Sequence, residues 1–451
     1  MITYTYKLYG SESQFRSVEA AILTTQFIRN KGIELWIAEG KKPKGQRHVG
    51  PNELSAMCAV LAKEYPFCKK LNSQARQAAA ERSWCSISNF YKKCSDPAYK
   101  NKKKGYPQFQ DDCRSVEYKA TGWKFSKDFR KITFTDKTGI GTLALKGGRW
   151  LDSELVKLAQ RIRIVKAKGE YFLQVALKLN AEVEESPSTE CATAFDLGLK
   201  EFLISHRGEA TPNPRFLRKS SNKLRRAQRK FSRSKKGGKN RKKNGKRVQR
   251  IHGKVANQRE DFARKLAKCV VMSNDVVVFE NLNIAALAKG FLSKSIHDVG
   301  WGLFLRWVKH YCEKFGKQLI LVNPADTTQA CCACGCLPSE KILLNVRTYH
   351  CEHCGLTLDR DMNAAINILK KALLLVQEQL ATAGHAESWS YVLHCLKKAL
   401  AEVELLKVFG EQASTSMAQA EGASLLVELE TAPMFTTKTF EDPCLKDHQI
   451  A

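Results

Sequence analysis

The sequence lacks any long apolar run. No segment of this 451-residue chain approaches the roughly 18 consecutive apolar residues that a membrane-spanning helix requires. Its first residues, Met1 to Lys7, also lack the apolar core of a secretory signal peptide. We therefore expect a cytoplasmic protein with no membrane partner.

Acidic residues are scarce relative to basic ones. The chain has 75 Lys and Arg against 45 Asp and Glu, which gives a formal net charge of +30. Such an excess does not specify a fold, but it favours polyanionic partners, above all nucleic acid.

No acidic residue at all lies between Arg215 and Arg259. Apolar residues in this segment recur at three- and four-residue steps, which predicts two helices joined by a loop at residues 235–238. Like charges at this density repel one another unless phosphates neutralise them, so we expect nucleic-acid contact here rather than a solvated face. The expected nucleic-acid-binding residues are Arg225, Arg226, Arg229, Lys230, Arg241, Arg247, Arg250 and Arg259.

Arginine is absent from residues 373–451. Five Lys stand there against nine Glu and two Asp, so this segment carries −6 and the preceding residues carry +36. Apolar periodicity over residues 373–408 predicts one or two helices. We expect 373–451 to be an acidic, partly disordered tail that is poorly suited to touch phosphates.

Strand and helix patterns divide the first 185 residues. Residues 1–10 and about 111–185 have strand-like alternation, as at 131–135, 161–165 and 171–177. Residues from about 15 to 100 instead follow a helical period. The pattern predicts a helical block inserted into a β-rich domain.

Three acidic residues lie where carboxylates are costly. Asp196 lies within the apolar run 191–199, Glu280 ends another apolar run, and Asp361 opens a helix rich in small residues. Burying an ion without a partner costs several kcal/mol, a penalty that a bound cation removes. Asp359 or Asp361 could instead cap the helix.

Converging carboxylates repel one another and would share protons in the absence of cations. Two Mg²⁺ or Mn²⁺ ions about 4 Å apart would keep them ionised and allow phosphodiester hydrolysis. Asp196, Glu280 and Asp361 are therefore the candidate catalytic and magnesium-binding residues.

Four of the sixteen cysteines form two close pairs, Cys331 with Cys334 and Cys351 with Cys354. Their spacing fits the C-x₂-C-x₁₅₋₂₀-C-x₂-C pattern of a structural zinc site with four thiolates. Cys332, Cys336 and His353 lie close enough to be alternative ligands, but they break the spacing of the pairs. A redox role for either pair is a further alternative.

Several of these segments resemble the TnpB family of transposon-encoded proteins, the ancestors of type V CRISPR effectors. They are FDLGLKEFLI at 195–204, FENLNI at 279–284, LDRDMNAAINIL at 358–369 and the two cysteine pairs. The resemblance is strong from about 186 to 370, weaker over 1–120 and absent from the tail. In the family the third acidic residue precedes x-Asn-x-Ala, which selects Asp361 over Asp359.

The resemblance implies an RNA-guided DNA endonuclease. Its partners would be a guide RNA from the transposon end and double-stranded target DNA with a short adjacent motif. Its cofactors would be two Mg²⁺ (or Mn²⁺) ions and one structural zinc. We expect the protein to act as a monomer.

The resemblance also implies a multidomain fold. An α/β RNase H-like (RuvC) nuclease domain would occupy 186–326 and 356–372, with a zinc ribbon inserted at 327–355. A wedge-like β-barrel at 1–14 and 111–185 would carry a helical recognition insertion at 15–110, and the tail would follow at 373–451.

Two other functions are compatible with these motifs. The first is an RNA-guided regulator that binds DNA without cutting it, which the intact acidic residues disfavour. The second is an RNA-independent transposase or resolvase, which the length of the basic helices disfavours.

Overall fold

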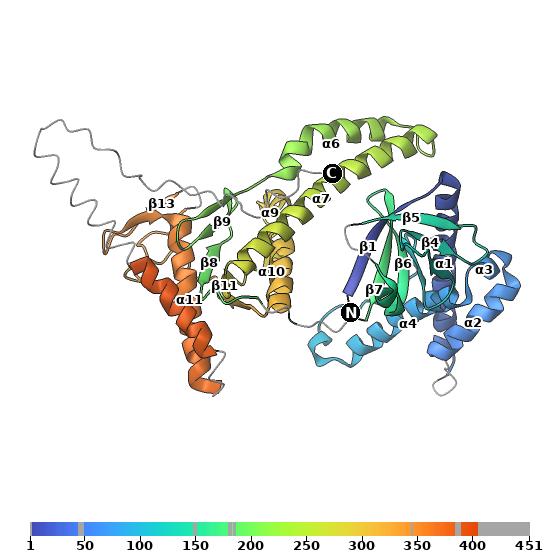
Figure 1. Ribbon diagram of the computed structural model, residues 1–451, viewed down its shortest axis with the longest axis horizontal. Coiled ribbons are helices and arrows are strands. Elements are labelled where there is room, and N and C mark those ends of the chain that lie inside the picture. The colour runs from blue at the N-terminus through green and yellow to red at the C-terminus, as the bar shows by residue number, and fades with distance from the viewer. Residues whose placement is uncertain are drawn as a thin grey trace, which may run out of the picture. The chain divides into compact units, whose positions relative to one another are not determined.

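The computed structural model describes residues 2–43, 49–147, 151–178, 183, 186–343, 346–383 and 389–404 (Figure 1). Contacts divide the chain into two units, Met1–Ala181 and Glu182–Ala451. Throughout the described ranges, no helix is both long enough and apolar enough to cross a bilayer.

The first unit contains a seven-stranded antiparallel sheet and a group of helices inserted after its first strand. The strands are β1 (Ile2–Tyr9), β2 (Ser115–Tyr118), β3 (Trp123–Phe125), β4 (Lys131–Phe134), β5 (Thr142–Lys146), β6 (Ala159–Ala167) and β7 (Glu170–Leu177). The helices are α1 (Glu12–Gly40), α2 (Pro51–Glu64), α3 (Pro66–Lys70), α4 (Ser73–Ser95), a short 3₁₀ turn (Pro97–Tyr99) and α5 (Ser153–Lys157).

The strand order of this sheet is β2-β6-β7-β1-β5-β4-β3, which places β1 in the middle. The three strand segments that we expected at 131–135, 161–165 and 171–177 are confirmed. Lys168 and Gly169, both with positive φ, form the tight turn between β6 and β7. Among the described residues β2 and β3 are the end strands of this sheet, and the wedge-like β-barrel that we expected at 1–14 and 111–185 stays a prediction.

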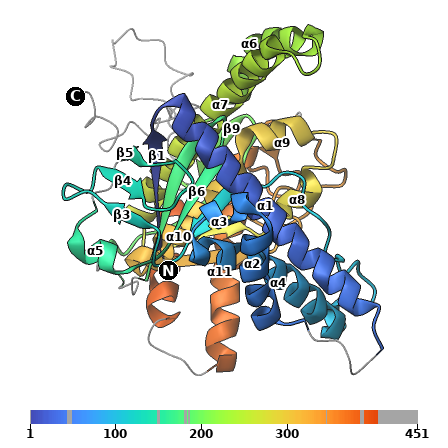
Figure 2. The same cartoon turned by 90° about the vertical axis from the view of Figure 1, so that its right-hand side faces the viewer.

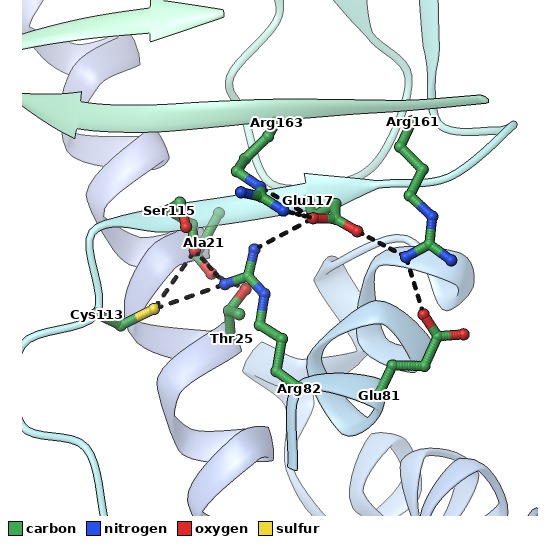
Figure 3. A network of polar contacts seen from close by, with 9 residues as sticks. All are labelled: Ala21, Thr25, Glu81, Arg82, Cys113, Ser115, Glu117, Arg161 and Arg163. Carbon is green, nitrogen blue, oxygen red and sulfur yellow. Dashed lines mark hydrogen bonds and ion pairs between the residues drawn. The ribbon is translucent and has the colours of Figure 1, made fainter. Parts of the chain in front are cut away.

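A buried carboxylate ties this sheet to the inserted helices. Glu117 of β2 accepts hydrogen bonds from Arg161 and Arg163 of β6, each at 2.9 Å, and lies 3.7 Å from Arg82 of α4 (Figure 3). Burial raises the pKa of Glu117, but the bonds from Arg163 and Arg161 outweigh it and the net shift is downward. Losing one partner of such a buried network is destabilising because it leaves an uncompensated charge.

The second unit contains a five-stranded sheet, a long helical hairpin and a small two-stranded ribbon. The strands are β8 (Ala192–Asp196), β9 (Glu201–Ser205), β10 (Ala210–Pro212), β11 (Val276–Glu280), β12 (Gln318–Val322), β13 (Thr348–His350) and β14 (Thr357–Asp359). The helices are α6 (Phe216–Arg233), α7 (Lys239–Met272), α8 (Ile284–Leu287), α9 (Ser293–Val299), α10 (Trp301–Phe315), α11 (Arg360–Ala383) and a further helix at 389–404.

The five-stranded sheet has the order β10-β9-β8-β11-β12. Strands β8, β11 and β12 are parallel, and β9 and β10 are antiparallel to their neighbours. Alternate strand residues point to opposite faces, so Val276 and Val278 pack with α11 whereas Val277 and Phe279 pack with α7 and α10. The sheet therefore lies between two helical layers (Figure 1).

The helix at 389–404 belongs to the layer of α11 and lies beside it (Figure 1). Its Cys395 and Leu396 are fully buried in the core that also contains β8 and β11. The Tyr391 hydroxyl donates to Asp275 just before β11 (2.5 Å), and Glu402 accepts from the Arg207 guanidinium (2.9 Å). The boundary that the charge pattern suggested at residue 373 thus falls inside α11, while residues 405–451 lie outside the described residues.

Helices α6 and α7 form an antiparallel hairpin that extends away from the sheet (Figure 2). A narrow apolar seam, with Leu224, Ala227 and Ile251 buried, holds the two helices together. At the start of α6, the N–H groups of Leu217 and Arg218 donate to the Asp298 carboxylate of α9 (2.9 and 3.1 Å). A residue of another helix therefore caps α6.

Candidate active site and metal centre

Two of the three expected carboxylates stand at the ends of neighbouring parallel strands. Strands β8 and β11 pair with Val278 opposite Ala194, and the same register continued by two residues brings Glu280 beside Asp196. The rings of Phe195 and Phe279, one residue earlier in each strand, stack at 5.4 Å between centroids. Asp196 and Glu280 are only 8% and 7% exposed, so both carboxylates are held in a largely dry environment.

The third carboxylate enters from the first turn of α11. The backbone N–H groups of Asp361 and Met362 donate to Asp359 Oδ1 at 2.9 and 3.1 Å, so Asp359 is the residue that caps the helix. Asp359 is exposed, whereas the Asp361 side chain is only 15% exposed. The helix cap and the buried carboxylate are therefore different residues.

The charges of Glu280 and Asp361 act on Asp196. Burial, followed by the negative charges of Glu280 and Asp361, raises the pKa of Asp196 to about 8. Burial also raises the pKa of Glu280, and burial with the charge of Asp359 raises that of Asp361. Their oxygens do not all lie within 4.8 Å of one another, in contrast to the cysteine sulfurs described below. A cation near Asp196 would reverse the penalty on its ionised form.

Three further residues approach these carboxylates, and the sequence patterns did not single them out. The Thr327 hydroxyl donates to Glu280 Oε1, and the charge of Lys371 also favours the ionised form of Glu280. An Arg347 nitrogen lies 3.5 Å from Asp361 Oδ2. Thr327 and Arg347 come from residues 327–355, the segment expected to form the zinc ribbon.

Two buried asparagines of α11 link this segment to the carboxylate site. Asn367 donates to the carbonyl oxygens of Thr327 (2.9 Å) and Ala330 (2.7 Å). Asn363 donates to Ala330 (2.8 Å) and accepts from the N–H of Cys332 (2.8 Å). The two asparagines are four residues apart and so share one helix face, which is otherwise apolar. Since buried polar side chains are hydrogen-bonded, this spacing could have indicated a contact with another segment.

The four expected cysteines come together. The sulfurs of Cys331, Cys334, Cys351 and Cys354 all lie within 4.8 Å of one another. The pairs Cys331–Cys354 and Cys334–Cys351 are each 3.6 Å apart, close to the roughly 3.8 Å edge of a tetrahedron with 2.3 Å zinc–sulfur bonds. The residues present therefore fit a tetrahedral zinc ion.

The two cysteine pairs have the same local geometry. Gly335 and Gly355 follow the pairs with φ of 77° and 74°, and their N–H groups donate to the Cys331 and Cys351 carbonyls. Backbone N–H groups of Cys354 and His353 lower the pKa of Cys351 to about 6, so its thiolate is available at neutral pH.

The alternative ligands separate into two groups. Cys332 is fully buried in the core beside α11 and lies outside the four-sulfur cluster. Cys336 and His353 form a second, more exposed group with Cys334, in which the ligand atoms also lie within 4.8 Å of one another.

Most of the expected nucleic-acid-binding residues are exposed on the α6–α7 hairpin. Arg241 and Arg259 differ. Arg241 stacks its guanidinium over the Phe231 ring at 4.2 Å and donates to the Phe231 and Ser234 carbonyls at the end of α6. Arg259 pairs with Asp298 at 2.7 Å, the carboxylate that caps α6. Both hold the hairpin in shape. The six exposed residues are Arg225, Arg226, Arg229, Lys230, Arg247 and Arg250.

Two family models match this chain. One, OrfB_IS605, described as "Probable transposase", matches residues 174–290, and a Cas12f1-like TNB domain matches residues 301–368. These ranges contain Asp196, Glu280, Asp361 and all four cysteines.

Curated relatives extend over more of the chain. A candidate RNA-guided DNA endonuclease of Streptomyces pristinaespiralis is 28% identical over 82% of this chain and 89% of its own length. A candidate RNA-guided DNA endonuclease of Escherichia coli K12, InsQ, is 25% identical over 60% of this chain and 70% of its own length. TnpB-like protein L79 of Acanthamoeba polyphaga mimivirus is 30% identical over 28% of this chain and 25% of its own length.

Among solved structures, a Cas12f1–sgRNA–target DNA complex covers 80% of this chain and 83% of the solved chain, at 15% identity and a TM-score of 0.46. A similarity with a TM-score below 0.5 does not identify the fold.

Proposed function

Because this chain belongs to the TnpB family, we propose that it is an RNA-guided DNA endonuclease that hydrolyses DNA phosphodiesters at Asp196, Glu280 and Asp361. The observation that carries this proposal is that burial and the charges of Glu280 and Asp361 together raise the pKa of Asp196, which the register of β8 and β11 places beside Glu280. Burial and repulsion that raise the pKa of Asp196 to about 8 are costly unless cations are bound there.

The nuclease fold that we propose for the second unit is RNase H-like. Support comes from its strand order, with β8 central between an antiparallel pair and two parallel strands, and from the acidic residues at the ends of β8 and β11. Ligands of open α/β sheets bind outside the carboxyl ends of the parallel strands. We propose nuclease segments at 186–326 and 356–372, a ribbon at 327–355 and a target-recognition region in the first unit.

Asp196, Glu280 and Asp361 would hold two Mg²⁺ ions, which when bound supply an activated water and stabilise the leaving oxygen. The surrounding residues keep the carboxylates oriented. Thr327 donates to Glu280, and the Asp359 cap fixes the helix turn that carries Asp361. Arg347, 3.5 Å from Asp361, adds positive charge at the position where a phosphate would approach.

The four cysteines would hold one structural zinc. In this proposal the zinc fixes the first cysteine pair. The N–H of Cys332, within that pair, donates to Asn363 of α11, and the carbonyl of Ala330, just before it, accepts from Asn367. Zinc binding would therefore stabilise the helix that carries Asp361.

The guide RNA and its duplex with DNA would contact the α6–α7 hairpin. Its six exposed basic residues offer phosphate contacts without an acidic neighbour between Arg215 and Arg259. In such a complex base pairing reads the sequence, and the protein reads mainly backbone and shape.

The decisive experiment co-purifies the protein with its RNA, sequences that RNA, and offers a plasmid library containing matching targets beside randomised flanks. We expect cutting that requires the RNA, a divalent cation and Asp196. Binding without cutting by the wild type would indicate a regulator, and cutting of an unmatched plasmid without RNA would indicate a transposase or resolvase.

A further inference from the structure

The first unit has a cluster of exposed aromatic side chains that its core does not use. Tyr91 of α4 is 50% exposed, and Tyr106 and Phe109 of the segment after α4 are 55% and 54% exposed. We call these three residues the aromatic platform. Large apolar side chains grouped on a surface mark interaction sites more often than single ones do.

The platform is held rigidly. The Tyr106 ring packs against Trp36 and Phe90, with centroids 5.1 and 5.4 Å apart, while more than half of its side chain remains exposed. Trp36 Nε1 donates to the Tyr91 hydroxyl at 3.0 Å. The Tyr106 and Tyr91 rings are thus supported by neighbouring side chains, while half or more of each side chain remains exposed.

The backbone beside Phe109 is pinned by two residues of α1, which lies beside α4 (Figure 2). Arg29 donates to the Gln108 carbonyl at 3.1 Å. Asn30 donates to the Gln110 carbonyl at 3.1 Å and accepts from the Gln110 N–H at 2.9 Å. This reciprocal pair keeps Phe109 presented to solvent without burying it.

Two hollows adjoin the platform. One, of about 520 Å³, is lined by Arg29, Ser86 and residues 105–110. The other, of about 470 Å³, is lined by Trp84, Ser88, Tyr91, Lys92 and Ser95 of α4 and by Asp96 just after it. Both are wide open to solvent, so they are shallow depressions beside the rings rather than enclosed pockets.

The segment that leads into Tyr106 is basic. No acidic residue lies between Asp96 and Asp111, and the sequence between them contains Lys100, Lys102, Lys103 and Lys104. Gly105, with φ of 70°, turns the chain from this lysine run into Tyr106. A basic run leading into open aromatic rings is the combination that binds single-stranded nucleic acid.

We infer that the aromatic platform stacks on unpaired nucleobases of a nucleic-acid strand while the lysine run neutralises the adjacent phosphates; this rests on the RNA-guided function proposed above. The strand comes either from the guide RNA or from the opened DNA, and both offer the same bases and phosphates.

The test compares full-length wild type with a Tyr106→Ala/Phe109→Ala double variant, using short oligouridine RNA and oligothymidine DNA as probes. We expect the Kd to rise about ten-fold or more for at least one probe, since each stacked base contributes roughly 1–3 kcal/mol. A Tyr106→Phe/Phe109→Tyr variant should restore binding. Phe67→Ala, which removes an exposed ring of α3, should leave the Kd unchanged.

Salt dependence separates stacking from charge. The double alanine variant should keep the wild-type slope of log affinity against log salt. Changing Lys100, Lys102 and Lys103 to Gln should flatten it by about two units. A loss confined to the RNA probe assigns the platform to the guide, and a loss confined to the DNA probe assigns it to the opened target. Unchanged affinity for both probes overturns the inference.

Photocrosslinking gives an independent readout. Iodouracil placed in either probe should form adducts at Tyr106 or Phe109, and adducts confined to other residues would overturn the inference. None of these measurements requires DNA cutting. A protein that never cuts but loses affinity in the double variant would therefore refute the endonuclease and retain the platform.

Discussion

The side-chain hydroxyl of Thr327 donates a hydrogen bond to Glu280 Oε1, and both residues are buried. The carbonyl of the same threonine accepts from Asn367 of α11. One residue thus connects the end of β11, the start of the cysteine-bearing segment and the helix that carries Asp361.

Thr327→Val should slow DNA cutting by roughly 10- to 100-fold, because a hydrogen bond to a charged group contributes about 1.5–3 kcal/mol. Single-turnover rates would measure this, with Thr327→Ser as the control that keeps the hydroxyl. RNA binding should be unaffected. Cutting by Thr327→Val at the wild-type rate would show that Glu280 does not need this donor.

Asp361→Asn should abolish cutting, whereas Asp359→Asn should cut at close to the wild-type rate. Asparagine caps a helix about as well as aspartate does, so the first turn of α11 survives in the second variant. Cleavage assays on both variants, each checked for RNA binding, distinguish the two roles. An inactive Asp359→Asn beside an active Asp361→Asn would exchange the assignment.

Cys331→Ser should lose the bound zinc and lower the melting temperature, because zinc binding by the four thiolates contributes to folding. Elemental analysis should find about one zinc per wild-type chain. Cys332→Ala and Cys336→Ser serve as matched controls and should both retain it. Zinc loss in Cys336→Ser would instead point to the exposed group that contains Cys334 and His353.

Changing Arg225, Arg226, Arg229 and Lys230 together to Gln should weaken RNA binding and flatten its salt slope by about three units, which is the share of four phosphate contacts. The loss should be alike for all guide sequences. Arg241→Gln should mainly lower thermal stability, since its guanidinium binds carbonyls at the end of α6. An unchanged slope in the quadruple variant would mean that this face is merely solvated.

Tyr391→Phe should destabilise the second unit above pH 5 and matter less as the pH falls. Burial raises the pKa of Asp275, but the bonds from Lys317, Tyr391 and Ser188 outweigh it and hold the pKa below its ordinary value. A depressed pKa contributes stability above the unfolded-state value of about 4, and this contribution is lost as Asp275 is protonated at lower pH. The difference in melting temperature between wild type and Tyr391→Phe should therefore persist down to about pH 4 and shrink as the pH falls further toward the depressed pKa of Asp275. A difference that widens on acidification would contradict the assignment.

Local patterns explain what the sequence could predict. The strands at 131–135, 161–165 and 171–177 follow a period of two, and the cysteine pairs carry their own turn glycines. An acidic residue at the end of a buried strand is likewise visible without a structure. These signals require no knowledge of how distant segments meet.

Contacts between distant segments explain the rest. Arg347 gave no signal because its approach to Asp361 depends on how the cysteine-bearing segment docks on α11. Arg241 and Arg259 have the same composition around them as their exposed neighbours, and only the fold of the hairpin separates them. The apolar periodicity over residues 373–408 predicted helices there, but it could not show that Cys395 and Leu396 are buried in a core shared with β8 and β11.

The central place of β1 in the first sheet has a consequence for synthesis on the ribosome. This strand is made before the other strands of its sheet, yet its partners β5 and β7 begin only at Thr142 and Glu170. Pairing must therefore wait until β5 has emerged, while the local contacts of α1 to α4 can form earlier. During that interval an unpaired strand is exposed to other nascent chains, so the expression yield should depend on translation speed and chaperone supply more than final stability would suggest.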